Sequence, residues 1–293
     1  MTREEIQDIE IQLLLEALRL RYGYDFRNYV ATSLRRRILQ CLAVCHLTHI
    51  SEIIPRLLHE GLFLERLLGV LTVSVTSLFR DPPVFLALRE LTVPMLKTHH
   101  FVNIWIAGCA TGEEVYTMAI LLQEEGIYER AQIFATDINE ESIHSAREGI
   151  YGADRWKEFE LNYKSAGGRE SLLNYCKVDH DQIQMDPELK KNVVFSNHNL
   201  ATDGTFAEMN LILCRNVLIY FDESLQKKVF TLFHESLSRG GHLCLGTSES
   251  LMCCQASHDF KTVSDRHRIF MTGFKRGRKI GARRPAQKQD SHR

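Results

Sequence analysis

The sequence predicts an α/β protein with a mainly parallel sheet, an all-helical N-terminal domain and a small inserted β subdomain. From about residue 100, short apolar segments alternate with segments of helical periodicity, a pattern typical of βαβ units. Before residue 72, only helical periodicity is present. About forty residues separate the second and third expected strands, which is too long for a plain crossover and indicates an insert.

The composition is that of a globular protein. The 293 residues, 44% hydrophobic and 25% charged, are enough for two domains. A formal net charge of -1 gives no general attraction to nucleic acid or acidic membranes, so neither is expected as a partner. The acidic N-terminus is unlike a signal peptide, and no apolar run reaches the roughly 18–20 residues of a membrane span, so no direct membrane insertion is expected. The eight cysteines lack metal-ligand spacing and fit reduced thiols in the cytoplasm.

Residues 1–72 are expected to form the helical domain, with a linker over 73–82. Gly23 falls where the first helix would have its C-cap. A second helix covers roughly 25–45, and two shorter helices follow in "HISEIIPRLLHE" and "FLERLLGVL". The first helix places these apolar residues at helical intervals: Ile6, Ile9, Ile11, Leu14 and Leu18.

Residues 83–274 are expected to form the α/β domain, with the insert at about 168–192 as a hairpin or three short strands. The tail over 275–293 is basic and poor in apolar residues, so we expect disorder, with a nucleic-acid-binding arm as the alternative. The expected strands are "VNIWIAG", "AQIFATD", "NVVFSNHNL", "MNLILCRN" and "GHLCLGTSE", and the expected helices cover 113–125, 140–148 and 223–238.

A glycine turn follows the first expected strand in "WIAGCATGEEVYTMAIL". Its spacing is G-x-x-x-G, unlike the dinucleotide pattern, and Glu113 and Glu114 stand where a phosphate would bind. These acids favour a ligand with a cationic group. Asp137 ends the next strand, where a carboxylate can accept hydrogen bonds from a ribose. Together they predict an S-adenosylmethionine site; a NAD-type site, or a plain helix start with acids favoured by its dipole, is the alternative.

Four segments then read together: "SVTSLFRD", "AGCATGEEVYTMAI", "FATDIN" and "NLILCRNVLIYF". In this order they closely resemble the chemotaxis-receptor methyltransferase family, the CheR type, and the similarity runs from about Arg21 to Phe270. The resemblance implies a Rossmann-like S-adenosylmethionine-dependent methyltransferase domain behind an all-helical domain, with a small β subdomain inserted. It implies methyl transfer to receptor glutamates, which leaves S-adenosylhomocysteine as the product.

The resemblance also implies the residues of the cofactor pocket. Thr76 and Arg80 would reach the methionine end, and Glu114 would bind the ammonium group. Ser74 stands where the family pattern has asparagine, so its hydroxyl would replace only part of that contact. Glu113 is interpreted as a helix-terminal acid. The remaining implied contacts are Asp137 with the ribose, Asn199 and Leu200 with the adenine, and Asn216 and Val217 beneath the sulfonium.

Methyl transfer to a glutamate oxygen needs alignment and dehydration more than proton transfer. A glutamate of pKa about 4.3 is already ionised at pH 7, so no general base is required. Arg80 could orient the substrate carboxylate as a planar fork donor, and Tyr220 could donate a hydrogen bond to the same oxygens. These two are the candidate catalytic residues. Alternatively, Arg80 forms an ion pair with Asp81 or a neighbour, and Tyr220 packs with its hydroxyl bonded to the backbone.

The implied partner is the cytoplasmic helical bundle of a chemoreceptor. Arg35, Arg36 and Arg37 form a basic run that could dock such a surface, or could equally be a solvated face. Gln40 and Cys41 stand where the family often has further arginines, which weakens the basic surface. The compact insert lacks an extra glycine-containing turn, so tight tethering of a receptor's C-terminal peptide is not expected. No metal is expected, because the histidines offer no third ligand at a useful spacing.

Two alternatives stand beside chemoreceptor methylation. The chain could methylate a different acidic protein or a small acid, or it could be a non-catalytic module that binds the cofactor or the receptor. Retention of the implied site residues argues against the non-catalytic module, because a decayed site should have lost some of them. A neighbouring gene for a receptor or a methylesterase would separate the first two functions.

Overall fold

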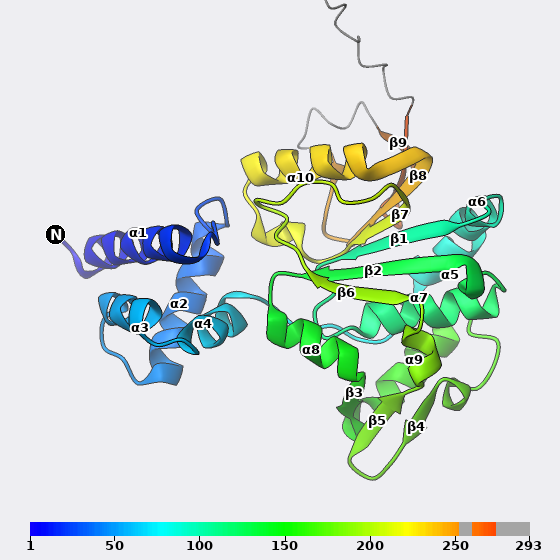
Figure 1. Ribbon diagram of the computed structural model, residues 1–293, viewed down its shortest axis with the longest axis horizontal. Coiled ribbons are helices and arrows are strands. Elements are labelled where there is room, and N and C mark those ends of the chain that lie inside the picture. The colour runs from blue at the N-terminus through cyan, green and yellow to red at the C-terminus, as the bar shows by residue number, and fades with distance from the viewer. Residues whose placement is uncertain (252–259, 274–293) are drawn as a thin grey trace, which may run out of the picture.

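The computed structural model describes residues 1–251 and 260–273, so the expected basic tail over 275–293 lies outside the described residues. Figure 1 shows a helical bundle beside a larger α/β domain, with an extended segment joining the two. Three apolar clusters form the cores: one inside the bundle and one on each face of the large sheet. The division into a helical domain, an α/β domain and an insert is the predicted one.

The N-terminal bundle begins with a capped helix. The Thr2 hydroxyl accepts a hydrogen bond from the Glu5 backbone N–H, and the Glu5 carboxylate accepts one from Thr2 in return. The helix ends at Gly23, whose φ of 80° is the left-handed C-cap that the sequence predicted. The helices of the bundle are α1 (Arg3–Tyr22), α2 (Ala31–Cys45), the short 3-10 helix η1 (Ile50–Glu52), α3 (Ile53–His59) and α4 (Phe63–Leu71).

The α/β domain contains a seven-stranded sheet in the order β6-β2-β1-β7-β8-β10-β9. The first five strands of that order are parallel and match the five predicted segments, while β10 and β9 add an antiparallel edge that the sequence reading missed. The chain leaves β1 toward β2 and later returns to β7 on the other side, so the strand order reverses between β1 and β7. The strands are β1 (Val102–Ala107), β2 (Ala131–Asp137), β6 (Val193–Asn197), β7 (Met209–Cys214), β8 (Leu237–Leu245), β9 (Phe260–Ser264) and β10 (Ile269–Thr272).

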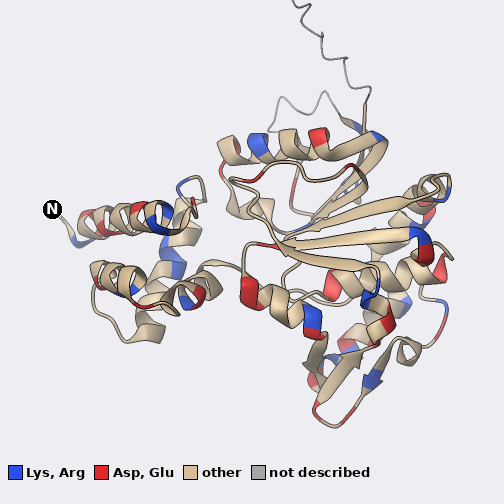
Figure 2. Ribbon diagram, in the orientation of Figure 1, with Lys and Arg blue, Asp and Glu red and all other residues tan. Residues whose placement is uncertain are grey.

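Helices cover both faces of this sheet, as Figure 1 shows. Successive side chains of β1 point to opposite faces: Ile104 and Ile106 pack into one apolar cluster, and Trp105 packs into the other. Figure 2 shows the charged residues gathered on helices and loops, with almost none on the central strands. The covering helices are α7 (Glu113–Glu124), α8 (Glu140–Glu148) and α10 (Glu223–Ser236), which were predicted, and α5 (Pro82–Ala87), the π-helical η2 (Leu88–Thr92) and α6 (Val93–Lys97), which were not.

The insert is a three-stranded antiparallel sheet in the order β3-β5-β4, which is one of the two predicted forms. Its strands are β3 (Ile150–Gly152), β4 (Cys176–Val178) and β5 (Gln182–Met185), and the helix α9 (Trp156–Ser165) lies between the first two. Strand β3 precedes the expected range of 168–192. Three residues directly after the Gly149 C-cap of α8 are too few to show an alternating pattern, which explains why this strand was missed.

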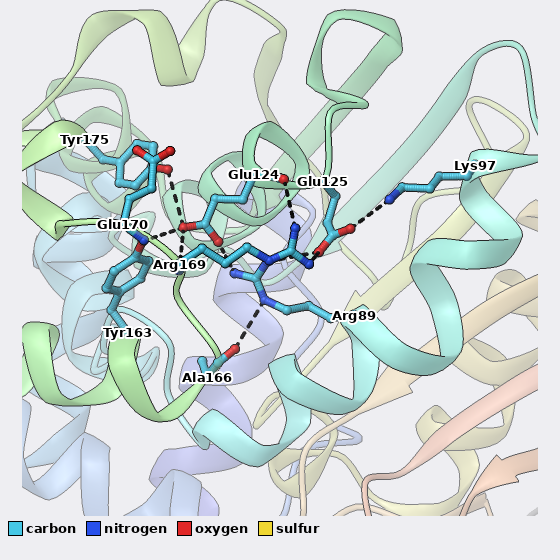
Figure 3. A network of polar contacts seen from close by, with 9 residues as sticks. All are labelled: Arg89, Lys97, Glu124, Glu125, Tyr163, Ala166, Arg169, Glu170 and Tyr175. Carbon is cyan, nitrogen blue, oxygen red and sulfur yellow. Dashed lines mark hydrogen bonds and ion pairs between the residues drawn. The ribbon is translucent and has the colours of Figure 1, made fainter.

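A polar network fastens the insert to the C-terminal end of α7 (Figure 3). Glu124 accepts hydrogen bonds from the hydroxyl groups of Tyr163 and Tyr175, and it forms a buried ion pair with Arg89 of η2. Arg89 also lies 3.3 Å from Glu125. A buried acid is tolerated when it is paired and hydrogen-bonded, as Glu124 is here. These contacts therefore fix the position of the insert relative to α7.

No single helix among the described residues is long and apolar enough to cross a bilayer. The pair formed by Ala31–Cys45 and Ile50–His59 meets the length and composition criteria only when taken together, across a 68° bend.

Candidate active site

A cavity of about 200 Å³ opens at the carboxyl ends of β1, β2 and β7, where the strand order reverses. Ser74 is not among the residues that line it, and its hydroxyl lies 2.7 Å from the hydroxyl of Ser142. The linker, the glycine turn, the end of β2, the segment after β6 and the turn after β7 form the walls. The other predicted cofactor-binding and catalytic residues all line this cavity: Thr76, Arg80, Glu114, Asp137, Asn199, Leu200, Asn216, Val217 and Tyr220.

The glycine turn approaches the neighbouring backbone closely. Gly108 has a φ of +80°, and a Cβ there would lie 2.5 Å from Cγ2 of Val217. Gly112 has a φ of +93°, and its Cβ would lie 2.7 Å from Cβ of Ala146. Both positions therefore favour glycine, since a side chain would clash with Val217 at the cavity wall or with Ala146 of α8.

Asp137 lies at the base of the cavity, where two loops meet. Its carboxylate accepts hydrogen bonds from the backbone N–H groups of Ala110, at 2.9 Å, and Asn139, at 3.0 Å. Burial raises the pKa of Asp137, and these N–H donors oppose that shift. A carboxylate has about four acceptor positions, so Asp137 can accept further hydrogen bonds from a pair of sugar hydroxyls.

Glu114 forms a buried ion pair with Arg215, which follows β7, at 2.5 Å. The same guanidinium lies 2.8 Å from Asp81 and donates to the carbonyl of Arg80. Burial alone would lower the pKa of Arg215, but the charges of Glu114 and Asp81 hold it above its ordinary value. Two acids share one arginine here, so the group keeps an excess negative charge that suits an ammonium ion.

Glu113 has a different role from its neighbour. Its fully buried carboxylate pairs with Arg155 at 2.5 Å and accepts a hydrogen bond from the Thr111 hydroxyl at 2.6 Å. Arg155 also donates to the carbonyl of Thr76, so one guanidinium joins the insert, the start of α7 and the linker. The interpretation of Glu113 as a helix-terminal acid omits this cross-link.

Arg80 and Tyr220 keep their polar groups available. Arg80 donates to the carbonyl of Val75 at 3.2 Å and forms no ion pair within the described residues. Its suggested partner Asp81 pairs with Arg215 instead, which contradicts the ion-pair alternative. The Tyr220 hydroxyl forms no hydrogen bond to the described part of the chain, which contradicts the backbone-bonded alternative.

The three arginines of the basic run on α2 make different contacts. Arg35 forms a partly exposed ion pair with Asp8 of α1 at 2.5 Å. Arg37 donates to the carbonyls of residues 70 and 72 and lies over the ring of Tyr220, 5.4 Å from its centroid. Only Arg36 is exposed without a hydrogen bond or ion pair in the described residues. That all three arginines dock a substrate stays a prediction, with Arg36 the one left unpaired.

Glu249 is a residue of the site that sequence reasoning missed. It is buried, and it accepts hydrogen bonds from the N–H groups of Asn216, Val217, Leu218 and Gly246, at 2.6 to 3.1 Å. These bonds hold the turn after β7, in which Asn216 has a left-handed φ of 61°. An acid shortly after the end of a strand, in "GTSES", was the only sequence signal for it.

Tyr29 was also missed, because it belongs to the helical domain. It lines the cavity, and its ring packs against Phe221 with centroids 4.9 Å apart. Two backbone hydrogen bonds flank this contact, from Val30 to the Tyr220 carbonyl and from Asp222 to the Asn28 carbonyl. The helical domain therefore completes the wall of the cavity and fixes the loop that carries Tyr220.

Residues 74–269 match the CheR methyltransferase SAM binding domain, and residues 9–72 match the CheR methyltransferase all-alpha domain. The chain belongs to the CheR methyltransferase family. It is 48% identical over 271 residues to Cher3 of Pseudomonas putida, which carries only a provisional methyltransferase name, and the match covers 92% of this chain and 99% of that one. It is 29% identical to chemotaxis protein methyltransferase 2 of Pseudomonas aeruginosa, covering 89% of this chain and 91% of that one. A chemotaxis protein methyltransferase of Borreliella burgdorferi is 30% identical, covering 83% and 88%.

This CheR-family chain is an S-adenosylmethionine-dependent methyltransferase, and its cavity suits that cofactor. The acceptor oxygens of Asp137 suit a ribose, and the excess negative charge beside Glu114 suits an amine. The glycine turn leaves its backbone close to the space between them. A dinucleotide would place its phosphates against the same acids, so the NAD-type alternative does not fit. Within the described residues, no group of three His, Cys, Asp or Glu side chains is arranged to hold a metal ion.

Proposed function

We propose that this CheR-family enzyme methylates glutamate side chains of a chemoreceptor-type signalling protein, forming glutamyl methyl esters. The observation that carries the proposal is the Arg80 guanidinium, which lines the cofactor cavity without an ion-pair partner in the described residues. A planar fork donor left unpaired beside a cofactor cavity suits an incoming carboxylate. Arg80 and Tyr220 are thus proposed to touch the acceptor.

Different residues around the cavity are proposed to bind different parts of S-adenosylmethionine. Asp137 is proposed to hold the ribose, and Glu114 the ammonium group, with Asn199 and Leu200 beside the adenine. Asn216 and Val217 would close the pocket beneath the sulfonium. S-adenosylmethionine supplies an electrophilic methyl carbon when it is bound. Every one of these residues lines the same cavity, which supports the assignment.

The acceptor requires no general base from the protein. A glutamate carboxylate is ionised at neutral pH, so its oxygen arrives ready to attack. Arg80 would orient the carboxylate with two parallel hydrogen bonds, and Tyr220 would donate one more. Because a strong arginine contact stabilises the ground state as well as the transition state, Arg80 acts mainly by positioning. Charge is cancelled as the two substrates combine, so a dry cavity favours the step.

The proposed partner is the cytoplasmic helical bundle of a chemoreceptor. The Pseudomonas aeruginosa and Borreliella burgdorferi relatives are named chemotaxis protein methyltransferases, which supports this substrate class. A cytoplasmic location is proposed with it, and the six described cysteines, all free and buried, are consistent with reduced thiols. Ser74 remains a weaker candidate for contact with the cofactor. Tight tethering of a receptor's C-terminal peptide is still not expected.

A second candidate function is methylation of a different acidic protein. It is favoured by α2, where Arg35 and Arg37 are engaged inside the molecule and only Arg36 is left for docking. The reaction and the cavity chemistry would be the same, and only the docking partner would differ.

The test is incubation of the purified enzyme with methyl-labelled S-adenosylmethionine and receptor-rich membranes. We expect label in the receptor that mild base releases as methanol, because a glutamyl methyl ester is base-labile. Label that resists base would exclude an ester product. Membranes from a strain without receptors are the control, and base-labile label on a soluble acidic protein instead would select the second candidate.

A further inference from the structure

A solvent-open groove of about 680 Å³ lies beside the cofactor cavity. One wall is the linker, and the other is strand β3 of the insert with the turn that follows it. Val75, Thr76 and Arg80 line both the groove and the cavity, so the two spaces meet at these residues. The groove is distinct from the pocket that holds the nucleoside, since neither Asp137 nor Asn199 lines it.

The groove has a polar lining and two apolar side chains at its edges. Val75 is 78% exposed and Ile150 is 41% exposed, and they come from opposite walls. Apolar groups left in water on facing elements indicate a protein partner more than a small polar metabolite. The hydroxyl-bearing residues that line the groove are Ser74, Thr76, Ser77, Thr111, Ser145 and Tyr151.

The charges of the groove leave it with one free cation. Arg155 is neutralised by Glu113 at 2.5 Å, and Glu158 accepts a hydrogen bond from the Ser77 hydroxyl at 2.5 Å. Arg80 forms no ion pair in the described residues. Because Glu113 neutralises Arg155, the groove has no net charge: the Arg80 cation and the Glu158 carboxylate remain. Arg80 stands at the end shared with the cofactor cavity, where it complements an incoming carboxylate.

The two walls are held at a fixed separation. Arg155 donates to the carbonyl of Thr76 on the linker, and its guanidinium lies 4.6 Å from the centroid of the Phe159 ring on α9. The hydroxyl of Tyr151 on β3 donates to the carbonyl of Thr111 in the glycine turn. A groove braced in this way exists before a partner arrives, so little ordering is needed on binding.

We infer that this groove docks the polypeptide segment that carries the acceptor glutamate, with the glutamate itself reaching Arg80 at the shared end. The inference rests on the proposed function, which requires the acceptor carboxylate to approach Arg80. The cofactor cavity is occupied by the first substrate during transfer, so the second substrate must enter through an adjoining space. The groove adjoins the cavity at Arg80 and offers far more room than one side chain needs. The insert therefore serves as a wall of the substrate site.

Introducing a charge at Ile150 tests this inference, because Ile150 lines the groove but not the cofactor cavity. We expect Ile150→Asp and Ile150→Lys each to raise the KM for the receptor cytoplasmic fragment about tenfold, because each replaces an apolar contact with a charge, and to leave the Kd for S-adenosylmethionine unchanged by calorimetry. The matched controls are Val194→Asp and Val194→Lys on β6, a position that is 44% exposed and lines neither space. Melting temperatures check the fold of all four variants.

The same variants are also compared by direct binding of the receptor fragment in the presence of S-adenosylhomocysteine. A Kd that rises in both variants of residue 150 but in neither variant of residue 194 supports the groove, even if the wild type transfers no methyl group to glutamate. That combination would overturn the proposed function alone. Glutamate methylation with KM and Kd values indifferent to the charge at residue 150 would overturn the groove alone. If the receptor fragment is neither bound nor methylated, both the groove and the proposed function are overturned.

Discussion

Arg215 lies 2.5 Å from the carboxylate of Glu114, and this buried ion pair joins the turn after β7 to the first turn of α7. Its second partner, Asp81, belongs to the linker that carries Arg80. One guanidinium thus fixes two walls of the cofactor cavity relative to each other. It also leaves the pair of acids with one uncompensated negative charge, which suits the amine that Glu114 is proposed to bind.

Replacing Arg215 with methionine should destabilise the fold. The change keeps an unbranched side chain but leaves two acids without their counter-charge, and breaking a buried pair in this way costs about 3–5 kcal/mol. We expect the free energy of unfolding in urea to fall by that amount. The control is Arg27→Met, which removes an exposed pair with Asp25 at 2.7 Å and should change stability little. Equal stabilities for the two variants would contradict the role assigned to Arg215.

Replacing Arg80 with alanine should remove most of the turnover and leave the fold intact. Its guanidinium donates to one backbone carbonyl and pairs with no acid in the described residues, so little stability depends on it. Loss of the positioning contact should lower kcat about 100-fold at saturating cofactor. Tyr220→Phe should lower kcat less, by about tenfold, because it removes one hydrogen bond. Wild-type rates for a folded Arg80→Ala would remove Arg80 from the site.

Replacing Glu249 with glutamine should weaken cofactor binding through the turn that Glu249 holds. The amide NH2 would face backbone N–H groups that now donate to a carboxylate, at a cost of about 1–3 kcal/mol. We expect the Kd for S-adenosylmethionine, measured by calorimetry, to rise at least tenfold. Glu208→Gln, at an exposed position, is the matched control. An unchanged Kd in the Glu249 variant would show that the turn does not need this carboxylate.

His242 should make the stability of the α/β domain depend on pH. Burial lowers its pKa from 6.5 to about 4, and its ring lies 2.9 Å from the Thr92 hydroxyl. Between pH 6.5 and 4 the unfolded chain binds a proton at this histidine and the folded chain does not, so stability falls as pH falls. From pH 6.5 to 5 the loss should be about 2 kcal/mol.

The measurement is urea unfolding at pH 7 and pH 5 for the wild type and His242→Gln. Glutamine can still bond to the Thr92 hydroxyl but does not titrate, so the variant should lose less stability on acidification. His144→Gln on the exposed side of α8 should behave like the wild type. A variant with the full pH dependence of the wild type would assign that dependence to other groups.

The cofactor cavity was predictable because its chemistry is local in the sequence. Gly108 follows a strand directly, and Asp137 ends the next one, so their meeting at one edge of a parallel sheet follows from the strand pattern. The partners of these residues were not predictable. Arg215 and Glu249 act across strands far apart in the chain, and a single sequence gives no register for such contacts.

The contacts of the three arginines on α2 were not predictable, for a related reason. Three consecutive arginines look equivalent in a sequence, but successive residues of a helix point in different directions. Arg35 therefore reaches α1, and Arg37 turns inward to the linker carbonyls and Tyr220. The missed edge strands β9 and β10 are short. The missed π-helical segment η2 lies between α5 and α6, two short helices with proline in their first turn, where the helical periodicity of the sequence is broken.

One cavity is proposed to present Asp137 to a ribose and Glu114 to an amine, with Arg80 left facing the acceptor. A crystal structure of the enzyme with S-adenosylhomocysteine tests it most directly. We expect the ribose hydroxyls within hydrogen-bond distance of Asp137, the ammonium group at Glu114, and the guanidinium of Arg80 open toward the groove. A nucleoside bound elsewhere, or bound with its amine away from Glu114, would contradict the account.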